Sequence, residues 1–110
     1  MAELYQGELL FATHDNVEHL ALIEQVIGPF PRRMLKRAKH SQLANEAFDS
    51  SGAHRMERVL KSESLAYVKK IGPLESLIFE EDSWLLRLLR RMLVIDPDER
   101  ATARECLRKF

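Results

Sequence analysis

The chain contains a single cysteine, Cys106, among its 110 residues, so no disulfide can form within it and no cysteine cluster could bind zinc. Neither sign of charge is in excess, because seventeen Lys and Arg residues balance seventeen Asp and Glu residues. This balance gives no support for nucleic acid or an anionic membrane as a general partner. No apolar run approaches the roughly 20 residues that a membrane-spanning helix needs. The N-terminus carries Glu3 and lacks a basic segment, unlike a secretory signal.

Glycine and histidine are also scarce, which limits the cofactors that this chain could hold. A loop that cradles nucleotide phosphates needs closely spaced glycines, and the four glycines are far apart: Gly7, Gly28, Gly52 and Gly72. A metal site needs histidines or cysteines at suitable spacing, and the histidines show none: His14, His19, His40 and His54. The sequence therefore predicts no cofactor-binding and no metal-binding residue in this chain.

Helical periodicity dominates the N-terminal half. Asp15 and Glu18 form a capping box, in which each side chain can bind backbone donors at the start of a helix over residues 15–27. The Gly-Pro pair that follows is a typical helix end. The apolar stripe of this helix, at helical spacing, comprises Val17, Leu20, Ile23 and Ile27, with Leu22 and Val26 beside it. Before it, residues 1–5 resemble the last turn of a helix that Gly7 ends, and Pro31 begins a short basic helix.

The C-terminal half is also predicted to be helical after an irregular stretch. Between residues 41 and 61 the periodicity fades, and Asp, Ser and Gly residues predict a loop. Residues 63–79 are moderately helical at first, and Gly72 and Pro73 then break the helix. A strong helix then begins at Asp82 or Ser83 and ends before Pro97, with a broad apolar face of Leu85, Leu88, Leu89, Met92 and Leu93. Thr102 and Glu105 form a capping box for the last helix, so the predicted fold class is all-α.

Two segments resemble protein kinases. Residues 18–29, EHLALIEQVIGP, are similar to the signature EHLAMMERILGP of LAMMER-type dual-specificity kinases, and ELYQGELLFATHDN before them resembles ELYTGELLFPTHDN. Residues 88–107, LLRRMLVIDPDERATARECL, resemble the closing subdomain of nearly all protein kinases. The resemblance implies that residues 1–110 are the last helices of a kinase C-lobe, truncated on the N-terminal side by a missing exon, a gene-model error or design. Residues 41–61 match the family poorly and are expected to be a loop or insert.

The resemblance also identifies candidate site residues. In the family, the arginine at the position of Arg100 pairs with the glutamate of the APE motif, which would lie upstream of Met1. Without that partner, we expect Arg100 to be hydrated or to bind Asp96 or Asp98; a solvated turn arginine is the alternative. His19 is expected to make a structural hydrogen bond. The family signature is retained at Glu18, His19, Leu20, Ala21, Glu24, Gly28 and Pro29.

The groups that would perform phosphoryl transfer are absent from this sequence. That reaction needs a glycine-rich loop, a lysine on the phosphates, a catalytic aspartate, and Asp and Asn ligands for metal, and the chain has no HRD, DFG or APE motif. The chain alone is therefore expected to be inactive. For the whole protein the resemblance implies ATP and magnesium, nuclear residence, Ser/Arg-rich splicing factors as substrates, and the remainder of the kinase domain as partner. The alternatives are a non-catalytic helical interaction module and an unrelated small helical bundle.

Two surfaces and one aromatic residue carry further expectations. The run of Arg32, Arg33, Lys36 and Arg37 is either a solvated helix face or a docking patch for acidic or phosphorylated sequences. Trp84 is expected to be an anchor in the core. Because only the last turn of the central C-lobe helix is present, the resemblance implies an exposed apolar patch formed by Leu9, Leu20, Ile23, Leu85, Leu89 and Met92.

Overall fold

The computed structural model describes residues 1–13, 15–49, 52 and 55–109, except the side chains of residues 56 and 57. His14 and His54 therefore lie outside the described residues. Within the described ranges the chain is helical and has no β-strand, which confirms the all-α class. The helices are α1 (Ala2–Gln6), α2 (Asn16–Val26), α3 (Arg32–Arg37), α4 (Gln42–Ala47), α5 (Met56–Val59), α6 (Ser62–Lys70), α7 (Leu74–Leu77), the 3-10 helix η1 (Glu80–Asp82), α8 (Ser83–Met92) and α9 (Ala103–Lys109).

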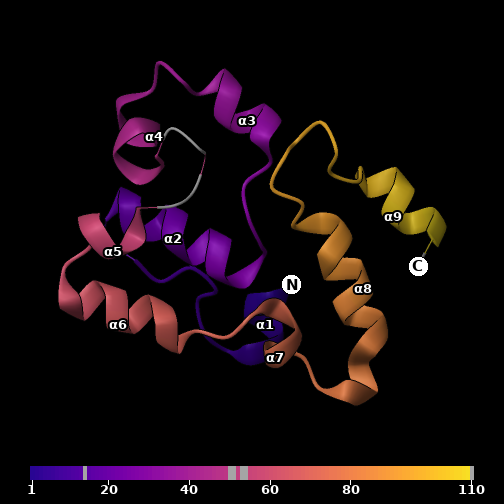
Figure 1. The fold of residues 1–110 in the computed structure, drawn as a ribbon. Coiled ribbons are helices and arrows are strands. Elements are labelled where there is room, and N and C mark those ends of the chain that lie inside the picture. The colour runs from indigo at the N-terminus through magenta and orange to yellow at the C-terminus, as the bar shows by residue number, and fades with distance from the viewer. Residues whose placement is uncertain (14, 50–51, 53–54, 110) are drawn as a thin grey trace.

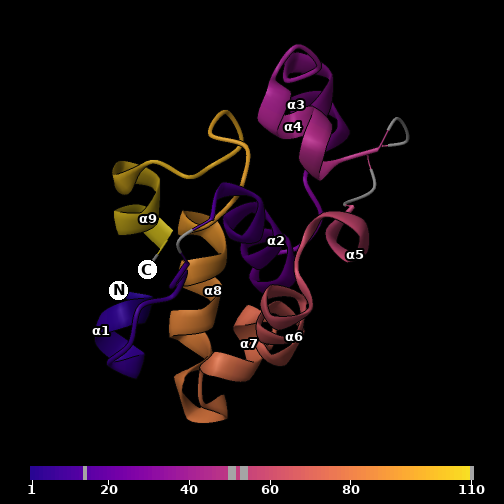
Figure 2. The ribbon, with the colours of Figure 1, turned by 90° about the vertical axis from the view of Figure 1, so that its left-hand side faces the viewer.

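The helices form two groups joined through α1 and α7. Helices α2 to α6 gather on one side, whereas α8 and α9 lie beside each other on the other side (Figure 1). In the perpendicular view, α3 and α4 stand at the top and α2 lies between α8 and α6 (Figure 2). Residues 93–102, between α8 and α9, approach α3 in Figure 1, and this junction carries the charged cluster described below.

Three buried clusters hold these groups together. Between α1, α7 and α8 the core comprises Ala2, Leu10, Val26, Leu74, Ile78, Leu85 and Leu89. A second cluster joins α2 to α6 through Ala21, Leu22 and Val68. The third joins the start of α2 to the end of α4 through Val17, Ala47 and Phe48. Helix α2 contributes to all three clusters, so the signature segment is the central packing element of the chain.

Helix α2 begins and ends as predicted, and its buried face is centred on the Leu22 side of the predicted stripe. The Asp15 Oδ1 accepts hydrogen bonds from the backbone N–H groups of Val17 (2.7 Å) and Glu18 (3.3 Å), which confirms the cap. At the other end Gly28 has a φ of 136°, a conformation that favours glycine. The buried face comprises Val17, Ala21, Leu22 and Val26. Three members of the predicted stripe, Val17, Leu22 and Val26, are thus buried. Leu20 and Ile27 are partly buried and pack against the cores, and Ile23 is partly buried.

Within residues 41–61 the structure has two helices that the sequence did not predict, α4 and α5, whereas the described residues between them, 48, 49, 52 and 55, lie outside helices. The Ser41 hydroxyl accepts a hydrogen bond from the Ala44 N–H (3.3 Å) and caps α4. Phe48 follows this helix and packs edge-on against Phe30, with ring centroids 5.1 Å apart. Ala47 is fully buried beside it. These short helices contain many small and polar residues and so lack a clear apolar periodicity. Tertiary packing stabilises such short helices more than local helix propensity does.

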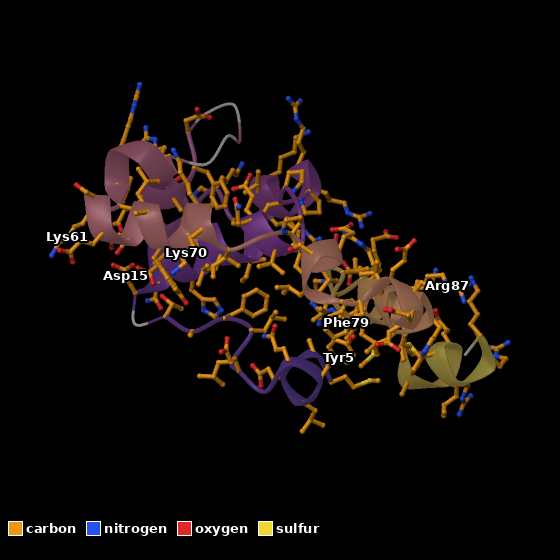
Figure 3. All side chains as sticks on the ribbon, turned by 90° about the horizontal axis from the view of Figure 1, so that it is seen from below. Tyr5, Asp15, Lys61, Lys70, Phe79 and Arg87 are labelled. Carbon is orange, nitrogen blue, oxygen red and sulfur yellow. The ribbon has the colours of Figure 1, made fainter. Side chains whose placement is uncertain are left out.

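The start of α8 differs from the prediction in two respects. The Asp82 side chain does not cap the helix. It instead accepts a hydrogen bond from the Tyr5 hydroxyl (2.6 Å). The Tyr5 hydroxyl oxygen also accepts a hydrogen bond from the Phe79 N–H (3.1 Å). The Tyr5 and Phe79 rings lie beside each other (Figure 3). Trp84 is 51% exposed, so its prediction as a core anchor was wrong. Leu85 and Leu89 occupy the core face of α8 in its place.

The predicted exposed apolar patch is therefore only partly correct. Leu85 and Leu89 are buried, whereas Leu9 and Met92 are exposed. Leu20 and Ile23 are intermediate. The most exposed apolar side chains near α8 and α9 instead include Trp84 and Leu107. The error follows from α1 and α7, which cover the face of α8 that the prediction left open.

Candidate functional site

The most densely connected polar group in the described part of the chain is Asp96, in the turn after α8. Asp96 is only 1% exposed. Its Oδ1 accepts a hydrogen bond from the Asp98 N–H (2.9 Å), and its Oδ2 accepts from Arg33 (3.0 Å) and Arg37 (3.3 Å) of α3. These contacts lower the pKa of the Asp96 carboxyl, first through the Asp98 N–H and then through Arg33. A buried carboxylate thus holds α3 against the turn between α8 and α9.

Two further acids complete this cluster. Arg33 Nη2 lies 2.7 Å from the Glu99 carboxylate, and Arg37 Nη1 lies 3.0 Å from the Asp98 carboxylate. The hydrogen bond to Glu99, followed by that to Asp96, raises the pKa of Arg33. Two cations of α3 are therefore matched by three acids, and half of the predicted docking patch is already paired within the chain. Arg32 and Lys36, its other members, are exposed and form no ion pair with any described residue.

Arg100 lies in the same turn but points to different partners. Its Nε donates to the Val94 carbonyl (2.8 Å) and its Nη2 donates to the Ile95 carbonyl (3.1 Å). Both carbonyls belong to the turn that follows α8 and its C-cap, Leu93. Arg100 thus stabilises the turn after α8 through these two carbonyl bonds. It does not bind Asp96 or Asp98, whose carboxylates are bound by the arginines of α3. A guanidinium carries five N–H donors, and the two carbonyl bonds use two of them.

Some of the signature residues on and after α2 are buried or support the helix start, and others are exposed. Glu18 accepts a hydrogen bond from the Thr13 hydroxyl (2.8 Å) and so supports the helix start from outside. His19 is exposed, and its ring lies 5.8 Å from that of Phe11; no hydrogen bond of its side chain occurs among the described residues. Ala21 is fully buried. Leu20 is partly buried, as is Gly28 at the helix end, whereas Pro29 is exposed.

Glu24 is the one signature residue with an unusual electrostatic environment. Its Oε2 is buried and has no hydrogen-bond partner among the described residues. Burial raises the pKa of this carboxyl, because a charge is less stable away from water. An unpaired carboxyl oxygen in the central helix costs stability in the chain as it stands.

An open apolar groove lies between α8 and α9. It has a volume of about 570 Å³, and its walls are Met1, Trp84, Leu88, Met92, Ala101, Ala103, Cys106 and Leu107. Large exposed apolar surfaces usually mark contacts with other polypeptide. Cys106 is partly buried in this wall and behaves as a small apolar residue there.

Metal-ligating side chains do not form a cluster in the described part of the chain. Three or more His, Cys, Asp or Glu side chains nowhere converge closely enough among them to hold a metal ion. Asp96 and Asp98 are neighbours in sequence, but arginines occupy their oxygens. Within the same residues, no helix has the length and apolar character needed to cross a membrane.

The Asp96 cluster was not recognised from the sequence as a single site. The sequence suggested Asp96 only as a possible partner of Arg100, and Arg33 and Arg37 only as members of a basic run. A weak signal existed, because the DPDE segment and the RRMLKR segment have opposite charge. Nothing local, however, indicates that segments about 60 residues apart meet, since Arg33 and Asp96 are separated by 63 positions.

Comparison with known proteins links the chain to kinases. No family model matches it. It is 40% identical to the serine/threonine-protein kinase AFC2 of Arabidopsis thaliana over 98% of this chain and 26% of that protein. It is 35% identical to the dual specificity protein kinase lkh1 of Schizosaccharomyces pombe, over 97% of this chain and 16% of that protein. It is 33% identical to human dual specificity protein kinase CLK4, over 97% of this chain and 22% of that protein.

A solved structure gives the same result. The crystal structure of the PF14_0431 kinase domain superimposes with a TM-score of 0.86 at 34% identity, over 96% of this chain and 31% of that chain. The chain thus spans less than a third of the proteins that it matches.

Proposed function

We propose that this chain is the closing section of the catalytic C-lobe of a LAMMER-type dual-specificity kinase, because its sequence is similar to such kinases and its fold to a kinase domain. The whole protein would transfer the γ-phosphate of ATP, with magnesium, to Ser, Thr or Tyr of protein substrates. This chain would supply packing surfaces and no reacting group. The groove between α8 and α9 carries the proposal, because an apolar groove of this size suits contact with the rest of a larger domain.

We propose a defined structural role for Arg100 within that assembly. Its bonds to the Val94 and Ile95 carbonyls orient the guanidinium and leave further N–H groups for a carboxylate. The family resemblance supplies the partner, the glutamate of an APE motif in the preceding part of the domain. An arginine held in place by backbone carbonyls loses less conformational entropy when it binds a carboxylate. Arg100 would thereby tie the activation segment to this section of the lobe.

Substrate class and location rest on the family resemblance alone. The proposed substrates are Ser/Arg-rich splicing factors, and the proposed location is the nucleus. Phosphorylation of a Ser/Arg-repeat peptide, compared with a peptide whose arginines are replaced by glutamate, tests the first. The distribution of a fluorescent fusion of the whole protein tests the second.

A chimera tests the central proposal. The matching C-terminal segment of AFC2 is replaced by this chain, and phosphate transfer is compared with that of AFC2 truncated before the segment. We expect the chimera to be active and both the truncated kinase and the 110-residue chain to be inactive. Arg100→Gln should lower the activity of the chimera more than Arg104→Gln, a matched change at an exposed position on α9. A folded chimera that is no more active than the truncated kinase would contradict the proposal and favour a non-catalytic interaction module.

A further inference from the structure

A groove lies between α3 and α4, on a different part of the molecule from the groove between α8 and α9. Figure 1 shows these two helices beside each other at the top of the molecule, and Figure 2 agrees. The volume of the groove is about 260 Å³, which is below the roughly 300–1,000 Å³ of pockets that enclose a small-molecule ligand. A groove of this size suits one or two side chains of a polypeptide. The apolar part of its lining comprises Leu35, Ala38, Ala44 and Phe48.

This apolar floor is the outer side of a packed cluster. Phe48 is buried and packs edge-on against Phe30, with ring centroids 5.1 Å apart. Leu35 and Ala44 are partly buried and pack against the same cluster. A floor that is already held by such packing binds a side chain without a large loss of its own conformational freedom. The groove is therefore formed before any partner binds.

Two lysines flank the apolar floor. Lys36 lies in the last turn of α3 and Lys39 follows that helix, and both are exposed residues of the lining. Neither side chain has an ion-pair or hydrogen-bond partner in the part of the chain that the structure describes. The one acid in the described lining is Asp49, so ammonium groups outnumber carboxylates there. Arg33 and Arg37, in contrast, are held by the Asp96 cluster.

An apolar floor with an ammonium rim matches a peptide in which acidic residues flank an apolar side chain. The apolar side chain would be removed from water against the floor, and the neighbouring carboxylates would pair with the lysines. Phosphate sites commonly use the paired donors of arginine, and the described lining contains no arginine. Sites for single-stranded nucleic acid typically stack bases on exposed aromatic rings, whereas Phe48, the aromatic residue of this lining, is buried.

We propose that the groove between α3 and α4 is a docking site for an acidic peptide segment of a partner protein, whose carboxylates bind Lys36 and Lys39. The basic run of the sequence thus divides into arginines that hold α3 in place and a lysine that serves recognition together with Lys39. The inference goes beyond the proposed kinase function and does not depend on it, because binding requires neither ATP nor phosphate transfer. An acidic ligand also differs in charge from the Ser/Arg-rich substrates proposed for the whole protein, so each proposal can fail without the other.

Fluorescence anisotropy of the full 110-residue chain tests the proposal. The first probe is a labelled peptide in which glutamates flank one leucine. Two altered peptides carry glutamine in place of the glutamates or glycine in place of the leucine, and an oligouridine RNA has the same charge as the first probe. We expect saturable binding of the acidic peptide, and binding at least about fivefold weaker for each altered peptide.

Two variants of the chain separate the contributions of the rim and the floor. Lys36→Gln combined with Lys39→Gln removes the rim charges and should weaken binding of the acidic peptide about fivefold or more. Ala38→Leu fills part of the groove without a change of charge and should weaken binding to a similar extent. Thermal unfolding followed by circular dichroism verifies that each variant is folded.

Lys61→Gln combined with Lys70→Gln is the matched control, because it removes two lysine charges from exposed positions at the two ends of α6 (Figure 3). It should leave the affinity for the acidic peptide unchanged within about twofold, since salt screens charges that do not contact the peptide. An equal loss in this control would show general charge attraction and would overturn the proposal. Unweakened binding of the peptide without leucine, tighter binding of the RNA, or the absence of saturable binding by the unaltered chain would overturn it as well.

Discussion

Replacing Leu22 by alanine tests the central role of α2 in this fold. Leu22 is 0% exposed and packs in the cluster that joins α2 to α6, beside Val68. A buried Leu→Ala change typically costs about 2–5 kcal/mol, the larger values where the surroundings cannot collapse into the cavity. A domain of this size is stable by roughly 5–15 kcal/mol, so we expect the loss of a large part of the free energy of unfolding.

The measurement is urea unfolding followed by the helical circular dichroism signal, repeated over a dilution series so that self-association can be recognised. Leu22→Ala should lower the midpoint at an unchanged m-value. Leu4→Ala is the matched control, because Leu4 is 90% exposed and such surface changes usually lie within about 0.5 kcal/mol.

Leu22→Met gives a second comparison, since the LAMMER signature has methionine at this position. A volume-conserving apolar change usually costs less than about 1.5 kcal/mol. If Leu22→Ala unfolded at the same urea concentration as Leu4→Ala, α2 would not be the central packing element. If Leu22→Met were as harmful as Leu22→Ala, cavity formation would not be the cause.

Three further predictions concern charged side chains. Asp96→Asn should lower the thermal midpoint at neutral pH. Contacts hold the pKa of Asp96 below its unfolded value, so the carboxylate stabilises the folded state above about pH 4 and loses this effect as the pH falls further. The melting temperatures of the two proteins should therefore converge in acid. Glu24→Gln should raise the thermal midpoint at neutral pH. The raised pKa of the Glu24 carboxyl means that its ionisation destabilises the folded state as the pH rises above about 4.5. The difference in melting temperature between the two proteins should vanish below that pH. Asp15→Ala should cost about 0.5–2 kcal/mol in urea unfolding through loss of the α2 cap, whereas Asn16→Ala, at the neighbouring exposed position, should cost less.

Local features were predictable from the sequence, and long-range ones were not. Asp15 caps α2 and Thr102 caps α9 as expected, because a cap depends on residues two or three positions apart. The burial of Trp84 was mispredicted because hydrophobicity alone cannot tell which side of α8 meets α1 and α7. Asp96 shows the same limit, since its partners lie on α3.

The resemblance located the helices in a kinase lobe but said little about surface charge. Family motifs consist mainly of caps, turns and apolar positions, which determine packing. Arg87, Arg90 and Arg91 lie between the apolar positions of α8, where the fold places few demands on residue type. The family motifs therefore say little about the partners of charges at such positions, and the structure is needed to identify them: Arg90 pairs with Glu75 and Arg91 with Glu105.

A net charge of zero consequently excludes less than the sequence analysis inferred from it. Charges interact over about 10 Å at ordinary ionic strength, so a partner responds to the local surface and not to the sum over the chain. Here the sum hides a local arrangement, because Arg33 and Arg37 of α3 are matched by Asp96, Asp98 and Glu99. Raising the salt concentration should lower the thermal midpoint only slightly through this cluster, because its central carboxylate is buried from solvent ions. A loss in high salt as large as that caused by Asp96→Asn would mean that burial of Asp96 does not protect its ion pairs.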